Sequence, residues 1–283
     1  MGSWEFPLVL FTVFGQWAIG LAATITLVEY IYPKVLNEAN TKQIRMGGMA
    51  VLPLIAIAMI SSVLHLGQPL AAFKSISNLG TSMLSLEILA FSIVGILALI
   101  YSYMWWKTPE KDSRKIVGVT LSIVGLMAVV ISSKVYALPA RLAWDSWQTI
   151  ATFLLTAVIL GAISVAYLLS KAEDENAQKA KKTLGWVIIA SVVAIVIVLG
   201  AFARTYGLSE EQAAAVAATF SSSIFYVRLI LGILLPAALA GVFIANQKSS
   251  SSVLSIALVG VVVGELAGRI LFYASVLSQY PWF

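Results

Sequence analysis

The stretch Leu184-Gly-Trp-Val-Ile-Ile-Ala-Ser-Val-Val-Ala-Ile-Val-Ile-Val-Leu-Gly-Ala-Phe-Ala203 runs without a single charged side chain. A helix of about 20 apolar residues is long enough to cross the hydrocarbon core of a bilayer. A segment in lipid must satisfy its backbone hydrogen bonds internally, which an isolated segment does only as a helix. The stretch therefore predicts a transmembrane helix.

Seven other segments share this length and composition. With the first they predict eight transmembrane helices, at Phe6–Tyr30, Ile44–Leu66, Met83–Tyr103, Ile116–Leu138, Trp147–Ser170, Leu184–Ala203, Ile224–Ala245 and Val253–Leu277. No long soluble insertion separates them, so we expect an all-α bundle that forms one integral membrane domain over residues 1–283. Pro236 is expected to kink the seventh helix.

The composition also indicates an integral membrane protein. The protein is 60% hydrophobic and 11% charged, whereas a soluble domain carries about a quarter charged residues. It has no cysteine and a single histidine, His65, so a thiolate-bound cluster and a bis-histidine haem are not expected. Redox chemistry would need a mobile carrier and a metal cluster held by a partner. The net charge of +5 belongs to the connections between helices and does not indicate nucleic-acid binding.

Basic residues favour the connections on one side of the predicted bundle by about two to one, which predicts that this side is cytoplasmic. Both termini then lie on the outer side of the cytoplasmic (inner) membrane. Residues 1–7 carry no basic side chain, so we expect no cleaved signal peptide. The inner connections Lys107–Lys115 and Lys171–Lys182 are predicted to be solvated turns. The outer connections are sparsely charged, which favours burial under a partner protein, and Ser209-Glu-Glu-Gln212 predicts a helix capping box.

Ionisable side chains at membrane depth are functional candidates because they are costly there. His65 is expected to close the second helix, and Glu87 lies about one turn into the third. The two helices are joined across the outer side, so both side chains should lie near the outer surface. An imidazole and a carboxylate facing one pocket suit quinol oxidation, because both can accept protons. Spacing alone leaves a second interpretation open. Both could be interfacial residues whose hydrogen bonds are supplied by the backbone of the connection between the two helices.

Four other ionisable residues have simpler interpretations. Glu265 and Arg269 are spaced i, i+4, which predicts a structural ion pair on one helix face, with a secondary role in shaping a quinol pocket as the alternative. Gly264 and Gly268 beside them predict a close helix approach. Lys134 is expected to extend to the interface, and Glu29, at the inner end of the first helix, to be hydrated.

Three blocks of the sequence resemble one family, the membrane anchor subunit of anaerobic dimethyl sulfoxide reductase (DmsC). They are the opening Glu5-Phe-Pro-Leu-Val-Leu-Phe-Thr-Val-Phe-Gly-Gln16, the stretch from Leu64-His-Leu-Gly-Gln-Pro69 to Leu84-Ser-Leu-Glu87, and the tail Gly264-Glu-Leu-Ala-Gly-Arg-Ile-Leu-Phe-Tyr273. The blocks lie at both ends and in the first third of the sequence, while the middle is looser. In one departure, the apolar Leu70-Ala71-Ala72 follows Pro69 where the family carries a basic residue, and Lys74 is the candidate substitute.

The resemblance implies a haem-free, eight-helix anchor that binds menaquinol at its outer side, with His65 and Glu87 in the family's quinol-associated positions. Electrons would pass to a four-cluster, ferredoxin-like iron–sulfur subunit and on to a molybdopterin catalytic subunit, both on the extracytoplasmic side. The terminal reductase site would then belong to another subunit, and no metal site is expected in this one. Two alternatives remain: an NrfD-type anchor of a polysulfide or similar reductase, and a small-solute or proton transporter. Transporters typically show internal repeats and polar sites at the membrane midplane.

Overall fold

The computed structural model describes residues 6–38, 40–65, 82–137, 143–203, 209–247 and 249–275, without the side chain of His65. Within these ranges every regular element is helical, and eight helical spans are long and apolar enough to cross a membrane. The elements are α1 (Phe6–Ile31), η1 (Pro33–Val35), α2 (Thr41–His65), α4 (Met83–Lys107), α5 (Ser113–Tyr136), α6 (Trp147–Leu168), α7 (Glu175–Phe202), α8 (Glu210–Phe220), α9 (Ser223–Leu229), the π-helical turn η4 (Ile230–Leu234), α10 (Leu235–Ile244) and α11 (Ser251–Ala274). The eight predicted spans are confirmed.

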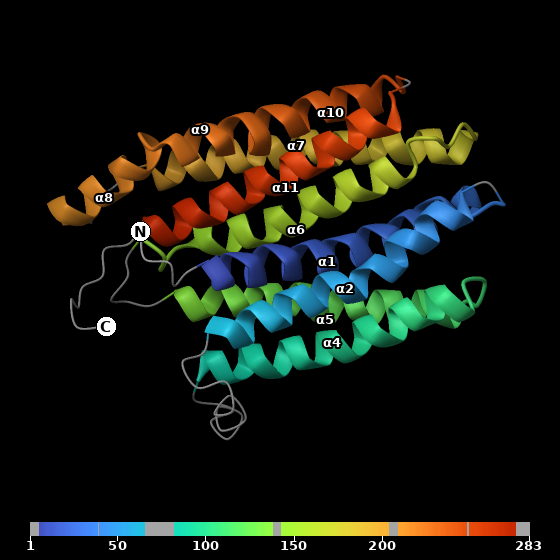
Figure 1. Cartoon of the computed structure of the whole chain (residues 1–283), viewed down its shortest axis with the longest axis horizontal. Coiled ribbons are helices and arrows are strands. Elements are labelled where there is room, and N and C mark those ends of the chain that lie inside the picture. The colour runs from blue at the N-terminus through green and yellow to red at the C-terminus, as the bar shows by residue number, and fades with distance from the viewer. Residues whose placement is uncertain are drawn as a thin grey trace.

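The helices form two groups of four spans (Figure 1). One group contains α1, α2, α4 and α5, and the other contains α6, α7, the continuous α9–η4–α10 span and α11. Within each group, consecutive spans pack against each other, and α1 packs on α6 to join the groups. In both groups, consecutive spans therefore run up and down beside each other. No repeat was apparent in the sequence.

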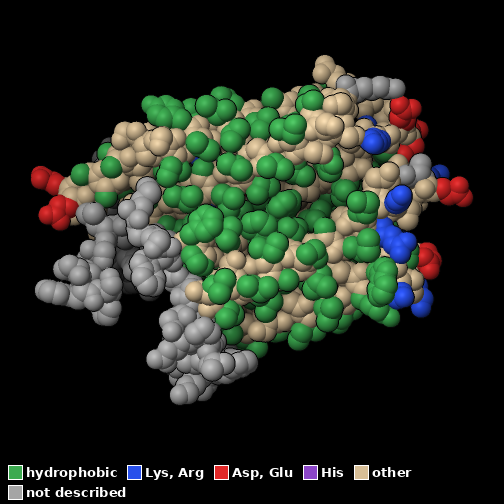
Figure 2. All heavy atoms as spheres, in the orientation of Figure 1, with side chains coloured by type: hydrophobic (Ala, Val, Ile, Leu, Met, Phe, Trp, Pro, Cys, Tyr) green, Lys and Arg blue, Asp and Glu red, His purple; other side chains and the backbone are tan. Residues whose placement is uncertain are grey.

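The core lies along α1 and α6, which are the most buried spans. Their backbones touch at Gly20 and Gly161, and a Cβ built on Gly20 would overlap the carbonyl oxygen of Ala157. Large aliphatic side chains such as Ile256 and Leu64 instead project outward, and hydrophobic side chains cover much of the face seen in Figure 2. This is the surface expected of a bundle whose solvent is lipid.

Substituting Gly20 by valine is therefore expected to separate α1 from α6. No rotamer moves a Cβ away from a backbone oxygen, so the helices must shift, at a cost of about 3 kcal/mol. Size-exclusion chromatography of the detergent-extracted protein should show loss of the monodisperse peak. Gly200→Val is the matched control, because a Cβ at Gly200 meets no atom within 4 Å; an equal loss in both variants would contradict the packing role.

The start of α1 and the end of α11 lie at the same end of the bundle, here called the terminal end (Figure 1). The opposite end, the hairpin end, carries the connections α1–α2, α4–α5, α6–α7 and α10–α11. Charged side chains gather there (Figure 2). At the terminal end, α8 begins with the exposed Glu210 and Glu211, and the Oγ of Ser209 accepts the N–H of Gln212 as the capping prediction required.

Two helical segments differ from the sequence prediction. The span predicted to begin at Leu184 begins at Glu175, so much of the expected turn Lys171–Lys182 is helical; Asp174 caps it by accepting the N–H of Ala177. In the seventh span, the expected effect of Pro236 takes the form of the π-helical turn η4, which ends two residues before it. Proline has no N–H to donate to the preceding turn, and a wider turn accommodates the missing bond.

Candidate functional site

Glu87 lies in α4, one turn from the terminal end. Ser82 caps this helix by accepting the N–H of Ser85. The Glu87 side chain is 6% exposed, and its Oε1 has no hydrogen-bond partner among the described residues. Ser132 of α5 is its polar neighbour. A buried carboxylate oxygen without a partner is costly and is a sign of a site that handles a ligand, water or protons.

A hydrogen-bonded tyrosine pair stands next to Glu87. The Tyr273 hydroxyl of α11 donates to the Tyr136 hydroxyl of α5 over 2.7 Å, and both tyrosines are buried. Both hydroxyls lie within electrostatic range of the Glu87 carboxyl group. Because Ser132 and Tyr136 are one turn apart on α5, the neighbour of the carboxylate and one of the two hydroxyls lie on the same side of that helix.

Aromatic side chains enclose this tyrosine pair. Trp144 stacks on Phe272 with 5.1 Å between ring centroids and donates its Nε1–H to the Phe272 carbonyl oxygen over 2.9 Å. Phe153 of α6 also contacts the Tyr136 ring. Tyr136 and Tyr273 were not identified from the sequence, because a tyrosine near the end of an apolar segment usually belongs to the interfacial aromatic belt. Here the side chains point into the bundle.

Arg269 continues the polar cluster along α11, one turn from Tyr273. Its guanidinium lies 3.6 Å from the centroid of the Phe153 ring, and its Nη2 donates to Oε1 of Gln16 over 2.8 Å. The Nη1 has no hydrogen-bond partner within the described ranges, although the side chain is buried. Gln16 on α1 was not identified from the sequence, where it is one amide within an apolar run.

The predicted ion pair between Glu265 and Arg269 is wrong. Glu265 instead pairs with Arg228 of α9: the Nη1 of Arg228 donates to Oε1 over 2.5 Å and to the Gly264 carbonyl oxygen over 3.2 Å. Thr156 of α6 donates to the other carboxylate oxygen over 2.8 Å. Arg228 sits six residues into an apolar segment, and this membrane-depth charge was the signal that could have identified it.

Glycines make room for Arg228, in agreement with the predicted close approach of α11. A Cβ on Gly268 would lie 2.8 Å from the Nε of Arg228, and a Cβ on Gly264 would overlap the Gly232 nitrogen in η4. The helix α11 therefore meets the π-helical turn at backbone distance. A larger side chain in place of Gly268 would displace Arg228 from Glu265.

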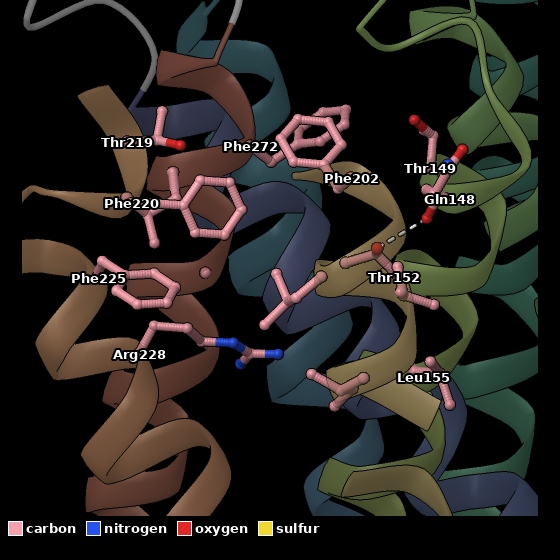
Figure 3. A pocket seen from close by; sticks show the side chains of 15 residues that line it. Gln148, Thr149, Thr152, Leu155, Phe202, Thr219, Phe220, Phe225, Arg228 and Phe272 are labelled. Atoms are coloured by element: carbon pink, nitrogen blue, oxygen red, sulfur yellow. Dashed lines mark hydrogen bonds between the residues drawn. The ribbon is translucent and has the colours of Figure 1, made fainter. Parts of the chain in front are cut away.

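Arg228 also borders a pocket between α6, α7, α8, α9 and α11 (Figure 3). Phe220, Phe225 and Arg228 lie on one side and Gln148 and Thr152 on the other, with the guanidinium extending toward the space between them. The cavity volume is about 60 Å³. That space holds a few water molecules but is far below the roughly 300 Å³ of a ligand pocket.

Glu29 was expected to be hydrated, and this prediction is wrong. It is 3% exposed at the hairpin end and forms a bidentate ion pair with Arg114 of α5, at 2.6 and 2.7 Å. The Arg114 guanidinium lies 3.8 Å from the Trp105 ring centroid. Arg114 was assigned to a solvated turn, but α5 begins at Ser113 and buries it. Lys134 is exposed, as predicted.

The other predicted site residues are described in part or not at all. His65 ends α2, which packs on α4, so its backbone lies at the same end of the bundle as Glu87. Its side chain lies outside the described atoms, and Lys74 lies outside the described residues. The structure thus places the helices that carry His65 and Glu87 side by side without showing the pair of side chains.

In the described part of the sequence, eight helices long and apolar enough to cross a membrane define a multi-pass membrane protein, and a cluster of buried polar side chains lies near the terminal end of its bundle. The protein belongs to the DMSO reductase anchor subunit (DmsC) family, whose sequence profile matches residues 1–275. The protein is thus a membrane anchor of a reductase complex.

Characterised relatives match along nearly the whole length. The C subunit of anaerobic dimethyl sulfoxide reductase from Haemophilus influenzae is 30% identical over 278 residues, which cover 96% of this protein and 95% of that one. The anaerobic dimethyl sulfoxide reductase subunit YnfH of Escherichia coli K12 is 27% identical over 278 residues, with coverage of 96% and 95%. The C subunit of the enzyme from the same organism is 29% identical over 282 residues, with 96% of each protein covered.

Proposed function

We propose that this protein oxidises a quinol, menaquinol, at the terminal end of the bundle and passes the electrons to an iron–sulfur subunit of a molybdenum-dependent reductase. Glu87 carries the proposal. Of the three glutamates that are buried within the described ranges, Glu29 and Glu265 are held by arginines, whereas no lysine or arginine in those ranges lies within ion-pair distance of Glu87. A carboxylate outside an ion pair can take and release a proton without breaking one.

Oxidation of a quinol to a quinone releases two electrons and two protons. His65 would accept a hydrogen bond from one quinol hydroxyl and take its proton, and Glu87 would receive a proton and relay it to water. The tyrosine pair would provide polar hydroxyl groups near the carboxylate. The electrons would leave one at a time to a cluster of the partner subunit, with Lys74 as a supporting charge at the pocket mouth.

The Arg228 pocket is not chosen as the quinol site because of its small volume and the pairing of its arginine. The pocket at Arg228 has room for water but not for a quinone ring, and its arginine is already neutralised by Glu265. We therefore assign Glu265 and Arg228 a structural role. Arg269 supplies positive charge behind the tyrosine pair.

The charge distribution supports the orientation of the proposed reaction. Basic side chains concentrate at the hairpin end, so the terminal end faces the extracytoplasmic side of the cytoplasmic membrane. The iron–sulfur and molybdopterin subunits would bind over that face. Protons and electrons would then leave on the same side, so this step would not itself generate a membrane potential.

His65→Ala tests the assignment through binding. Removing an imidazole that bonds the quinol oxygen is expected to weaken a quinol-analogue inhibitor about tenfold or more, the effect of one lost hydrogen bond to a polar ligand. Titration of the purified complex with the inhibitor measures this. Val63→Ala, two residues away on the exposed side of α2, should bind normally; undiminished binding by the His65 variant would remove His65 from the site.

A further inference from the structure

A second, larger cavity lies away from the polar cluster, among α1, α5, α6 and α7. Its volume is about 180 Å³, and its lining is aliphatic and small, including Ala23, Leu126 and Ala157. A dry apolar cavity of about 150 Å³ is enough to hold a benzene molecule. The cavity therefore suits a segment of a hydrocarbon chain and offers little to a polar ligand.

The cavity opens on the flank of the bundle. Among its lining residues Leu27 and Ile31 are each 59% exposed, and Val158 is 36% exposed. Small residues on the neighbouring helices, with Gly20 against Ala157, bring α1 and α6 together and leave a groove beside them. In a membrane this groove faces the lipid chains.

At the hairpin end, polar side chains border the groove and form its mouth. Tyr32 and Thr183 both line it and share a hydrogen bond of 2.6 Å between their hydroxyls. Lys179 lies one turn from Thr183 on α7 and within electrostatic range of the Tyr32 hydroxyl. Lys34 lies two residues beyond Tyr32 and is exposed. Glu175 pairs with Lys179, so among these three side chains Lys34 supplies the excess positive charge.

We propose that this groove binds an anionic phospholipid, with one acyl chain in the cavity and the phosphate at Lys34 and Lys179. The aliphatic lining of the cavity favours an acyl chain, and the exposed Lys34 together with Lys179 favours an anionic over a zwitterionic headgroup. Basic pockets between membrane helices bind anionic headgroups by the same combination. The proposal does not depend on quinol oxidation, because the groove is formed by other residues.

The test uses the full-length protein, delipidated in detergent and titrated with phosphatidylglycerol or phosphatidylcholine while native mass spectrometry counts bound lipids. Phosphatidylglycerol should bind about thirtyfold more tightly, as expected from two lysines at a headgroup. The double variant Lys34→Gln/Lys179→Gln should lose most of that preference. The control Lys42→Gln/Lys107→Gln changes two lysines of the same end on α2 and α4, which do not line the groove, and should keep it.

A second variant tests the acyl-chain part of the site. Val158→Phe places a ring in the groove from an exposed position, so the bundle should fold while the tightly held lipid is lost. Size-exclusion chromatography checks the fold in the same preparation. Equal binding of both lipids, an equal effect of the control pair, or full lipid retention by a folded Val158→Phe variant would overturn the proposal.

Discussion

Replacing Glu87 by glutamine is expected to lower menaquinol-dependent turnover of the complex at least about 100-fold, the range of a lost general base. The amide has the same size and can keep the neighbouring Ser132 as a polar partner, but it cannot take a proton. Because Glu87 holds no ion pair among the described residues, the substitution should leave folding and assembly intact. A rate defect without a stability defect is the specific expectation.

Glu210→Gln is the matched control for this prediction. Glu210 is also a glutamate at the terminal end, but it is exposed at the start of α8, so turnover should not change. Glu265→Gln should differ from both by lowering the amount of folded protein, since it leaves Arg228 buried without its counter-ion. Normal turnover by the Glu87 variant would assign this carboxylate a purely structural role.

Replacing Arg114 by alanine is expected to destabilise the protein by about 3–5 kcal/mol, the cost of leaving a buried charge without its partner. The guanidinium makes two bonds to Glu29, donates its Nε–H to the Pro109 carbonyl oxygen over 2.8 Å and stacks on Trp105. Both members of the pair are almost fully buried, so water cannot readily replace these contacts. Quinol chemistry at the other end of the bundle should be unchanged in the protein that folds.

Unfolding of the detergent-solubilised protein measures this effect. Lys115→Ala is a control from the next residue, since Lys115 pairs with Asp112 at the surface over 3.2 Å, and exposed pairs contribute at most about 1 kcal/mol. The double variant Glu29→Gln/Arg114→Gln should be less damaged than the sum of its single substitutions, because it buries no unpaired charge. Equal losses for Arg114 and Lys115 would contradict the buried pair.

The spans could be predicted from the sequence because each depends on local apolar length. The ion pairs could not, because their partners come from different helices. Spacing placed Glu265 beside Arg269, but packing brings Arg228 within 2.5 Å of the carboxylate. Arg269 turns instead to Gln16 and the Phe153 ring, and no one-dimensional pattern distinguishes these outcomes.

The candidate site could likewise be predicted only in part. Glu87 was identified because a carboxylate in an apolar helix is rare, and the structure shows it buried. Tyr136 and Tyr273 were missed because their significance arises only when α5 and α11 meet. Glu29 was misassigned because a charge near a helix end is usually hydrated; here, the start of α5 covers it with Arg114.

The most direct test of quinol oxidation at Glu87 is single-turnover reduction of the intact complex by menaquinol, followed anaerobically through the iron–sulfur signals of the partner subunit. We predict rapid cluster reduction in the native complex. Reduction should be at least about 100-fold slower in a fully assembled complex carrying Glu87→Gln. Cluster reduction at the native rate in that variant would contradict quinol oxidation at this site.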